Sequence, residues 1–296
     1  MVPRPLVIWD SCLRQSPEAH CRRMTTHTWR ACGVAFQLLA VGVAARAQTD
    51  VVELEPVADT TLIETAPNNN LGAAWFFNAG SATTGTRNHG LLRFDFTGII
   101  PAGAVIESAQ LTLSVTRQPA AGGQDSTFGL YRVLRPWGEG DKTHQGTPEA
   151  PISPGLGTPA GVNDATWNDR FALSGQPWTA PGAAPNEDYT SLASSVQFIQ
   201  GILESPYVFS STPELVNDVQ SWLDQPAANF GWMLISDAES EGIPSTARSF
   251  GARENADPAL RPQLMVTYTP VPEPGIAALW SVGVLGAVWL SRRKRR

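Results

Sequence analysis

The chain has 296 residues, of which 42% are hydrophobic, 26 are Gly and 24 are Pro. This mixture supports a packed core with many turns and excludes a disordered chain or a long coiled coil. The charge is uneven: residues 1–47 and 271–296 hold 11 of the 21 basic residues but 3 of the 27 acidic ones. Residues 48–270 therefore keep 10 basic and 24 acidic residues, a formal charge of −14. Such an acidic segment is a poor binder of phosphate backbones, which excludes nucleic acid as a partner.

The first 47 residues are predicted to be an export leader. Gly33–Ala45 is a mostly apolar stretch of 13 residues, too short for a permanent membrane span, and a small-residue cleavage pattern follows at Ala45-Arg46-Ala47. Because the residues before Met24 are polar, we expect translation to begin at Met24. A lipoprotein signal at Cys32 is an alternative, but Trp29-Arg30-Ala31 is not the small apolar box that it requires.

Cysteine usage agrees with this division of the chain. All three cysteines, Cys12, Cys21 and Cys32, lie in the leader. The exported part therefore has no disulfide, no thiol nucleophile and no cysteine-based zinc site, although it enters an oxidising compartment. Its fold must depend on its core.

The C-terminal segment 271–296 carries three features in a fixed order. Pro272-Glu273-Pro274 is followed by 15 apolar or small residues, Ile276–Leu290, and then by five basic residues, Arg292–Arg296. As a helix the apolar part spans about 22 Å, less than a hydrocarbon core of about 30 Å, and the basic run favours the cytoplasmic side. This order resembles the PEP-CTERM sorting tail.

The resemblance implies a C-terminal transmembrane helix that holds the chain in the inner membrane during export. It also implies recognition by an exosortase, cleavage near the motif, and release or attachment at the cell surface or in the extracellular matrix. A plain single-pass anchor, in which Pro-Glu-Pro only ends a helix, is the alternative.

Residues 48–270 are predicted to form one all-β domain, because short apolar runs alternate with Gly/Pro turns and show no βαβ rhythm. In Ala109–Thr116 the apolar Leu111, Leu113 and Val115 alternate with polar residues, as in a strand with one wet face. The other runs are Thr60–Glu64, Trp75–Asn78, Gly80–Thr86, Gly90–Phe96, Phe128–Leu134, Phe230–Ile235, Ala247–Ala252 and Leu264–Tyr268. The pattern favours an antiparallel sandwich.

One helix is predicted after Thr212. Thr212 suits the N-cap, Pro213 the first helical position and Glu214 the first turn. An apolar stripe follows, made of Leu215, Val219, Trp222 and Leu223. We expect this stripe to cover one end of the sandwich. Residues 140–206, rich in Gly, Pro, Asn and Ser, are expected to be loops with a functional or flexible role.

Seven segments in the same order resemble the DNRLRE-type domain, a jelly-roll β-sandwich related to carbohydrate-binding modules. They are Asp59–Gly72, His89–Val115, Leu130–Asp141, Ala165–Arg170, Leu215–Leu223, Asn229–Ile235 and Ser249–Tyr268. Together they extend from about residue 57 to residue 269. The hexapeptide that names the family is absent, and Arg253-Glu254 stands in its neighbourhood. The resemblance implies a jelly roll and, as one option, polysaccharide binding.

Aromatic residues in and beside the loops are the predicted sugar contacts. Trp137, Trp167 and Trp178 could stack on sugar faces if they are exposed. The alternative is that they pin the loops to the core, which the motifs favour for Trp137 and Trp167 but not for Trp178. Arg135 and Arg170, with Arg132 nearby, could pair with uronate carboxylates.

A calcium site is a second possibility. Asp237, Glu239 and Glu241 alternate before Gly242, as in the first half of a calcium-binding loop. The bidentate Glu expected at the twelfth position is replaced by Arg248, so a solvated acidic loop is the alternative.

Catalysis has little support in the sequence. The exported part has two histidines, His89 and His144, no Cys and no nucleophile-elbow or zinc-protease motif. His89 is expected to pack or to face solvent. Glu139 and Asp141 form the best carboxylate pair, for which a structural role is expected. The sequence thus predicts a non-enzymatic, exported protein that binds polysaccharide, with a structural or adhesive matrix protein, and then a hydrolase or lyase, as alternatives.

Overall fold

The computed structural model describes residues 48–120, 123–146, 151–152, 155–271 and 293. The predicted leader, the Pro-Glu-Pro motif and the apolar tail lie outside these residues. Within the described part, no helix has the length and apolar character needed to cross a membrane.

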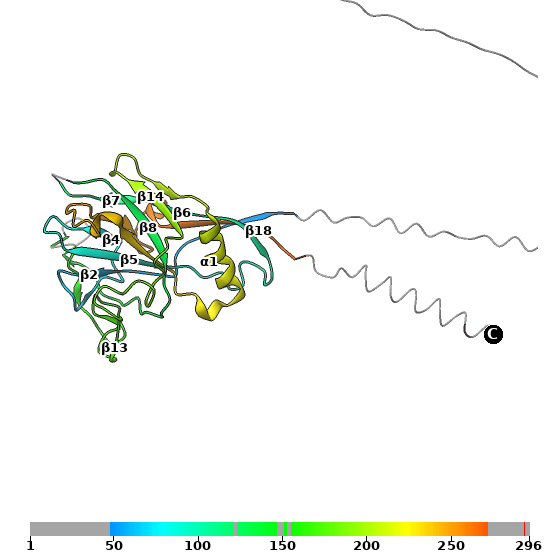
Figure 1. Cartoon of the computed structure of the whole chain (residues 1–296), viewed down its shortest axis with the longest axis horizontal. Coiled ribbons are helices and arrows are strands. Elements are labelled where there is room, and N and C mark those ends of the chain that lie inside the picture. The colour runs from blue at the N-terminus through cyan, green and yellow to red at the C-terminus, as the bar shows by residue number, and fades with distance from the viewer. Residues whose placement is uncertain (1–47, 121–122, 147–150, 153–154, 272–292, 294–296) are drawn as a thin grey trace, which may run out of the picture. The chain divides into compact units, whose positions relative to one another are not determined.

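Two main sheets, built entirely from antiparallel pairs, form the framework of this part (Figure 1). The smaller has the order β1-β18-β6-β15, and the larger has the order β14-β8-β16-β5-β4-β17-β7, with β2 paired to β5. Their strands are β1 (Asp50–Leu54), β2 (Ala58–Ile63), β4 (Phe76–Ser81), β5 (Arg87–Arg93), β6 (Val105–Leu113), β7 (Val115–Arg117), β8 (Ser126–Arg132), β14 (Ser195–Ile199), β15 (Tyr207–Phe209), β16 (Trp232–Ser236), β17 (Arg248–Gly251) and β18 (Gln263–Thr269). The prediction of an all-β fold with one helix is confirmed.

Six short strands and three 3-10 turns complete the described elements. The short strands pair as β3 (Asn69–Asn70) with β11 (Thr158–Pro159), β9 (Gln145–Gly146) with β10 (Pro151–Ile152), and β12 (Asp169–Phe171) with β13 (Gln176–Pro177). The turns are η1 (Pro226–Ala228), η2 (Asp237–Glu239) and η3 (Pro258–Leu260). Within the predicted loop region 140–206, the structure therefore places five of these short strands and β14.

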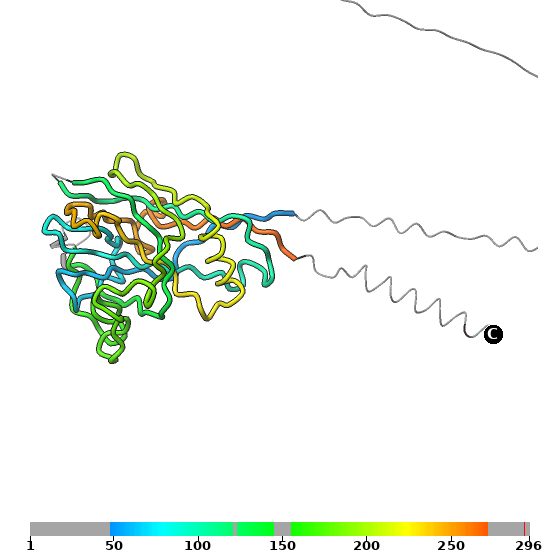
Figure 2. Tube along the Cα trace, viewed as in Figure 1, coloured from blue at the N-terminus to red at the C-terminus, as the bar shows by residue number. Residues whose placement is uncertain are grey.

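The two sheets share one hydrophobic core. Leu111, Leu264 and Val266 of the smaller sheet belong to the same buried cluster as Phe77 and Phe128 of the larger one. Two sheets that enclose one core are consistent with a β-sandwich. At one edge of the smaller sheet, all of β1 pairs with Leu264–Tyr268 of β18, so the first and last strands are neighbours (Figure 2).

The strand predicted over residues 109–116 changes sheets part-way. β6 belongs to the smaller sheet, β7 belongs to the larger, and Ser114 lies between them. Leu111, Leu113 and Val115 are buried as predicted, but Ser114 is buried too, because its carbonyl accepts the backbone N–H of Gly251. The expected wet face is therefore interrupted at Ser114, since Thr112 and Thr116 on either side are partly exposed.

Helix α1 (Pro213–Asp224) forms as the sequence predicts. The Thr212 hydroxyl accepts the backbone N–H of Leu215 at 3.0 Å and caps the first turn. The apolar stripe is buried and packs on the core beside β6. Asp218 is buried as well, which the sequence did not indicate. Its carboxylate accepts the Trp232 indole N–H at 2.8 Å, and burial raises its pKa.

A second, smaller core lies on the other face of β2, β5 and β16. Leu62, Leu91 and Met233 of these strands are buried with Trp137, Trp167 and Trp178 from the long loops. The loops therefore form a third layer over the larger sheet. This explains why all six residues of β2 are buried rather than every second one.

Candidate functional site

The three tryptophans predicted to contact sugars lie inside this third layer. Trp137, Trp167 and Trp178 are 3%, 4% and 3% exposed. The indole N–H of Trp137 donates to the Phe230 carbonyl at 2.8 Å, and that of Trp178 donates to the Thr166 carbonyl at 2.9 Å. None of the three offers an open ring face. Of the two alternatives that the sequence left open, stacking on exposed rings is contradicted, and the rings fix the loops to the sheet.

Two of the arginines named with them, Arg135 and Arg170, hold the same layer together, whereas Arg132 pairs with helix α1. Arg135 donates to the Glu187 carbonyl at 3.3 Å and lies 3.6 Å from the Asp188 carboxylate. Arg170 donates to the Pro136 carbonyl at 2.9 Å. Arg132 lies 3.4 Å from the buried Asp218. Their guanidinium groups are thus already engaged by the protein.

The acidic loop does not form the calcium-binding geometry that the alternation of Asp237, Glu239 and Glu241 offered as a possibility. Residues 237–239 form the 3-10 turn η2, and the Glu239 carboxylate lies 2.8 Å from the His89 ring. Asp237 and Glu241 are both exposed, and Asp237 accepts the Ser126 hydroxyl at 2.7 Å. No group of three or more His, Cys, Asp or Glu among the described residues could hold a metal ion. The alternation seen in the sequence therefore does not bring the three carboxylates to one point.

Glu139 has the structural position expected for it. Both of its carboxylate oxygens accept from the Arg253 guanidinium, at 2.9 and 3.0 Å, and one of them also accepts the Asp59 backbone N–H. Asp141 is exposed and pairs with the neighbouring Lys142. The two carboxylates therefore have separate partners.

Asp59 and Glu254 complete this acidic cluster. Asp59 is 1% exposed and accepts the backbone N–H of Arg253 at 2.9 Å. Burial raises the pKa of Asp59 well above its ordinary value and also raises that of Glu254. The cluster joins the β2 strand to the Trp137–Asp141 loop and to the segment after β17.

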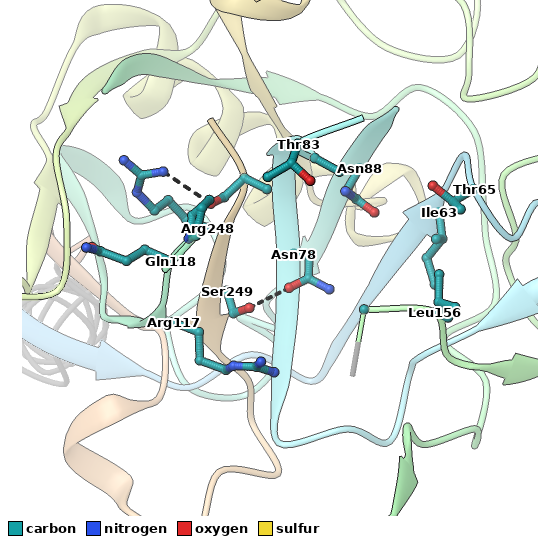
Figure 3. A pocket seen from close by; sticks show the side chains of 14 residues that line it. Ile63, Thr65, Asn78, Thr83, Asn88, Arg117, Gln118, Leu156, Arg248 and Ser249 are labelled. Carbon is teal, nitrogen blue, oxygen red and sulfur yellow. Dashed lines mark hydrogen bonds between the residues drawn. The ribbon is translucent and has the colours of Figure 1, made fainter. Parts of the chain in front are cut away.

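A different feature, which we call the polar cleft, is the strongest candidate for a binding site. It has a volume of about 420 Å³ and lies over β4, β17 and β7 (Figure 3). Its polar lining comes from Thr65, Asn78, Thr83, Asn88, Arg117, Gln118 and Ser249. Phe77 and Phe250 point from the same two strands into the core, so period-two alternation sends Asn78 and Ser249 to the opposite face.

Two asparagines of the polar cleft are fixed but not saturated. Asn78 Oδ1 accepts the Ser249 hydroxyl at 2.7 Å, and its Nδ2 points away from Ser249, toward the side of Leu156 (Figure 3). Asn88 Nδ2 donates to the Gly80 carbonyl at 3.3 Å. Among the described residues, no acceptor takes Asn78 Nδ2 and no donor takes Asn88 Oδ1. The cleft therefore presents an oriented donor and an oriented acceptor.

The charge of the polar cleft differs from that of the domain. Arg117 and Arg248 are its charged lining residues, and no carboxylate from the described part lines it. Arg248 is 3% exposed and donates to several backbone carbonyls, including that of Gln200. Arg117 lies over the Phe76 ring at 5.8 Å and has no carboxylate within 4 Å among the described residues. Its positive charge is therefore not neutralised by an ion pair.

The sequence reasoning missed these residues. The one local indication is the alternation in Phe77, Asn78 and Ala79. It places the Asn78 amide on the face of the strand opposite to the core-facing Phe77 and Ala79. It could not show that Arg117 and Ser249 lie beside that amide, since these residues come from three strands distant in sequence.

Comparisons with known proteins identify no relative. No protein-family model matches the chain, and no curated protein matches it significantly. The resemblances to the DNRLRE-type domain and to the PEP-CTERM tail therefore stay predictions from the motifs.

Proposed function

We propose that this chain is an exported, non-enzymatic protein that binds polysaccharide in the polar cleft. The observation that carries the proposal is the combination of a free amide donor, a free amide acceptor and the unpaired Arg117 guanidinium in one cleft. Sugar rings present hydroxyl groups that both donate and accept, so they match fixed amides. A guanidinium binds carboxylates in bidentate fashion, which favours an acidic glycan.

A glycan-binding screen of the purified chain tests the proposal, with acidic and neutral glycans compared. Arg117→Gln and Asn88→Ala should weaken retention of the best glycan at least tenfold. Arg135→Gln and Arg170→Gln are the controls, because they change charge at the sites predicted from sequence, away from the polar cleft. If the controls lost glycan binding and Arg117→Gln kept it, the binding site would lie at Arg135 and Arg170 instead of the polar cleft. If the parent chain bound none of the glycans, the proposal would be refuted.

We also propose that residues 48–270 have a jelly-roll topology and that the chain is exported to the cell surface or extracellular matrix. The order of the seven segments supports the jelly roll, and the leader and tail motifs support export. Residues 276–290 would form a transmembrane helix that anchors the chain in the inner membrane until an exosortase removes it. The mass of the surface form tests this, since it should lack both the leader and the residues that follow the Pro-Glu-Pro motif.

A structural or adhesive role is the second candidate, and one surface feature favours it. β14 and β15 are edge strands of the two sheets and contact each other. Phe198 and Val196 on β14 are 53% and 57% exposed, and Leu203 beyond β14 is 94% exposed. Exposed apolar side chains on an edge strand promote pairing between copies.

Sedimentation over a range of concentrations tests the adhesive role. Phe198→Lys should abolish self-association. Val51→Lys is the control and should leave self-association unchanged: Val51 is 63% exposed, but it lies on β1, at the opposite edge of the smaller sheet from β15 and away from the proposed contact. A parent chain that is monomeric at every concentration would exclude this role.

A further inference from the structure

A second cavity, which we call the tyrosine cavity, shares no lining residue with the polar cleft. Its volume is about 390 Å³, and it lies where residues 181–191 meet β5, β8, β16 and η2. Its apolar walls are Pro181, Ala183, Pro185 and Ile235, and Tyr131 and Tyr189 add two aromatic rings. Its charged residues are Arg87, His89, Asp237 and Glu239.

Three of these four charged residues are neutralised by their partners. Arg87 binds Glu64 through two contacts, Nε to Oε2 at 3.0 Å and Nη2 to Oε1 at 2.7 Å. His89 Nδ1 lies 2.9 Å from the Gly182 carbonyl, and Nε2 lies 2.8 Å from Glu239 Oε2. Because the Gly182 carbonyl can only accept, His89 Nδ1 must carry a hydrogen. A hydrogen bond between His89 Nε2 and Glu239 Oε2 needs one further proton, which sits on one of these two atoms. Wherever that proton sits, the His89–Glu239 pair has no net charge.

Asp237 therefore gives the tyrosine cavity a net negative charge. One of its oxygens accepts the Ser126 hydroxyl, and no cation among the described residues lies within 4 Å of its carboxylate. Glu239 adds an incompletely satisfied group: its side chain is 7% exposed, and its buried Oε1 has no hydrogen-bond donor in the described part of the chain. Burial, and then the charges of Asp237 and Glu239, raise the pKa of Tyr131.

The two rings suit an organic cation. Tyr131 and Tyr189 are half-buried and meet edge to face, with centroids 5.7 Å apart and planes at 68°. Aromatic faces attract ammonium groups, and a nearby carboxylate adds a charge-assisted hydrogen bond. A metal ion is less suited, since it needs several oxygen ligands at one point and the cavity supplies no such group.

We propose that the tyrosine cavity binds the free ammonium group of an amino sugar. Asp237 would accept from the ammonium, and the tyrosine rings would surround it. The hydroxyls of Ser191, Ser240 and the two tyrosines would bind the hydroxyls of the sugar, and the proline walls would contact its C–H faces. Hydroxyl groups on several sides favour a polyhydroxylated ring over the plain alkyl chain of a lysine.

Calorimetric titration of the purified chain with a glucosamine tetramer, at a pH where its amines are charged, tests the proposal. Binding should be at least tenfold tighter than that of the N-acetylated tetramer. Asp237→Asn should weaken it at least tenfold. Glu241→Gln removes the same charge from the same loop but not from the cavity, and should leave it unchanged.

Three outcomes would overturn the proposal. These are equal affinity for the two tetramers, equal weakening by both substitutions, or a lysine tetramer that binds as tightly as the glucosamine tetramer. A melting temperature retained in Asp237→Asn separates lost binding from lost folding. Since Arg117→Gln should not affect this titration, failure here and failure of the polar cleft are distinguishable.

Discussion

Replacement of Glu139 by Gln tests whether the Glu139 carboxylate is structural, as its contacts indicate, or catalytic. In Glu139→Gln the amide oxygen can still accept the Asp59 backbone N–H and one Arg253 donor. The amide nitrogen would face the second Arg253 donor, so that hydrogen bond and the ion-pair charge are lost.

The loss of unfolding free energy in Glu139→Gln depends on how far water reaches the Glu139 and Arg253 side chains. A hydrogen bond to a charged group contributes about 1.5–3 kcal/mol when desolvated. The Glu139 side chain is 18% exposed but that of Arg253 is 38% exposed, so water replaces part of the loss. We expect the free energy of unfolding to fall by about 1–3 kcal/mol, which lowers the melting temperature of a domain this size by about 3–10 °C.

Urea denaturation followed by tryptophan fluorescence measures this change. Asp141→Asn is the matched control, because Asp141 is a nearby carboxylate whose side chain is 81% exposed. It should change the free energy of unfolding by less than about 0.5 kcal/mol. The structural role would be refuted by two results together. The urea midpoint of Glu139→Gln would equal that of the parent chain, and the parent chain would release reducing ends from a glycan while Glu139→Gln would not, which would favour a hydrolase or lyase.

Three further predictions concern the fold. Thr212→Ala removes the cap of α1 and should lower the free energy of unfolding by about 1 kcal/mol in urea, whereas Thr212→Ser should recover most of it. Gly231→Ala should cost about 3 kcal/mol or more, because φ is 75° and a Cβ would lie 1.9 Å from the Leu92 carbonyl oxygen. Gly85→Ala, with φ of 84° and nothing within 4 Å, should cost only about 1 kcal/mol, and equal costs would contradict the clash. Because the pKa of Asp59 is raised in the folded chain, ionisation of Asp59 destabilises the fold. The stability of the parent chain relative to Asp59→Asn should therefore be constant below about pH 3.8 and fall as the pH rises through the folded pKa. Urea titrations from pH 3 to 8 measure this difference, and a constant or rising value would contradict the assignment.

Local patterns were sufficient to predict most of the elements. The Thr212 cap, Pro213 and the apolar stripe fix α1, because a helix start needs a side-chain acceptor and its buried face needs 3.6-residue spacing. Apolar runs between turns likewise located β8, β16, β17 and β18. The edge strands β14 and β15 were missed, because they are five and three residues long, too short for their alternation to stand out in the sequence.

The functional sites depended on contacts that no local pattern carries. Tryptophans in loops, such as Trp137, Trp167 and Trp178, are typical of sugar-binding surfaces. Tertiary packing nevertheless buries all three, because the outer face of the larger sheet needs an apolar cover. In the same way, Glu239 turns to His89, 150 residues away in sequence, instead of joining Asp237 and Glu241 around an ion.

The sequence by itself determined the all-β class, the helix and the acidic, cysteine-free character of residues 48–270, because composition and short-range periodicity act within one element. Only the tertiary structure decided which polar groups remain unpaired. Asn78, Asn88 and Arg117 come from three strands, and their free hydrogen-bonding groups exist because the neighbouring strands satisfy some of their atoms and leave others facing the polar cleft.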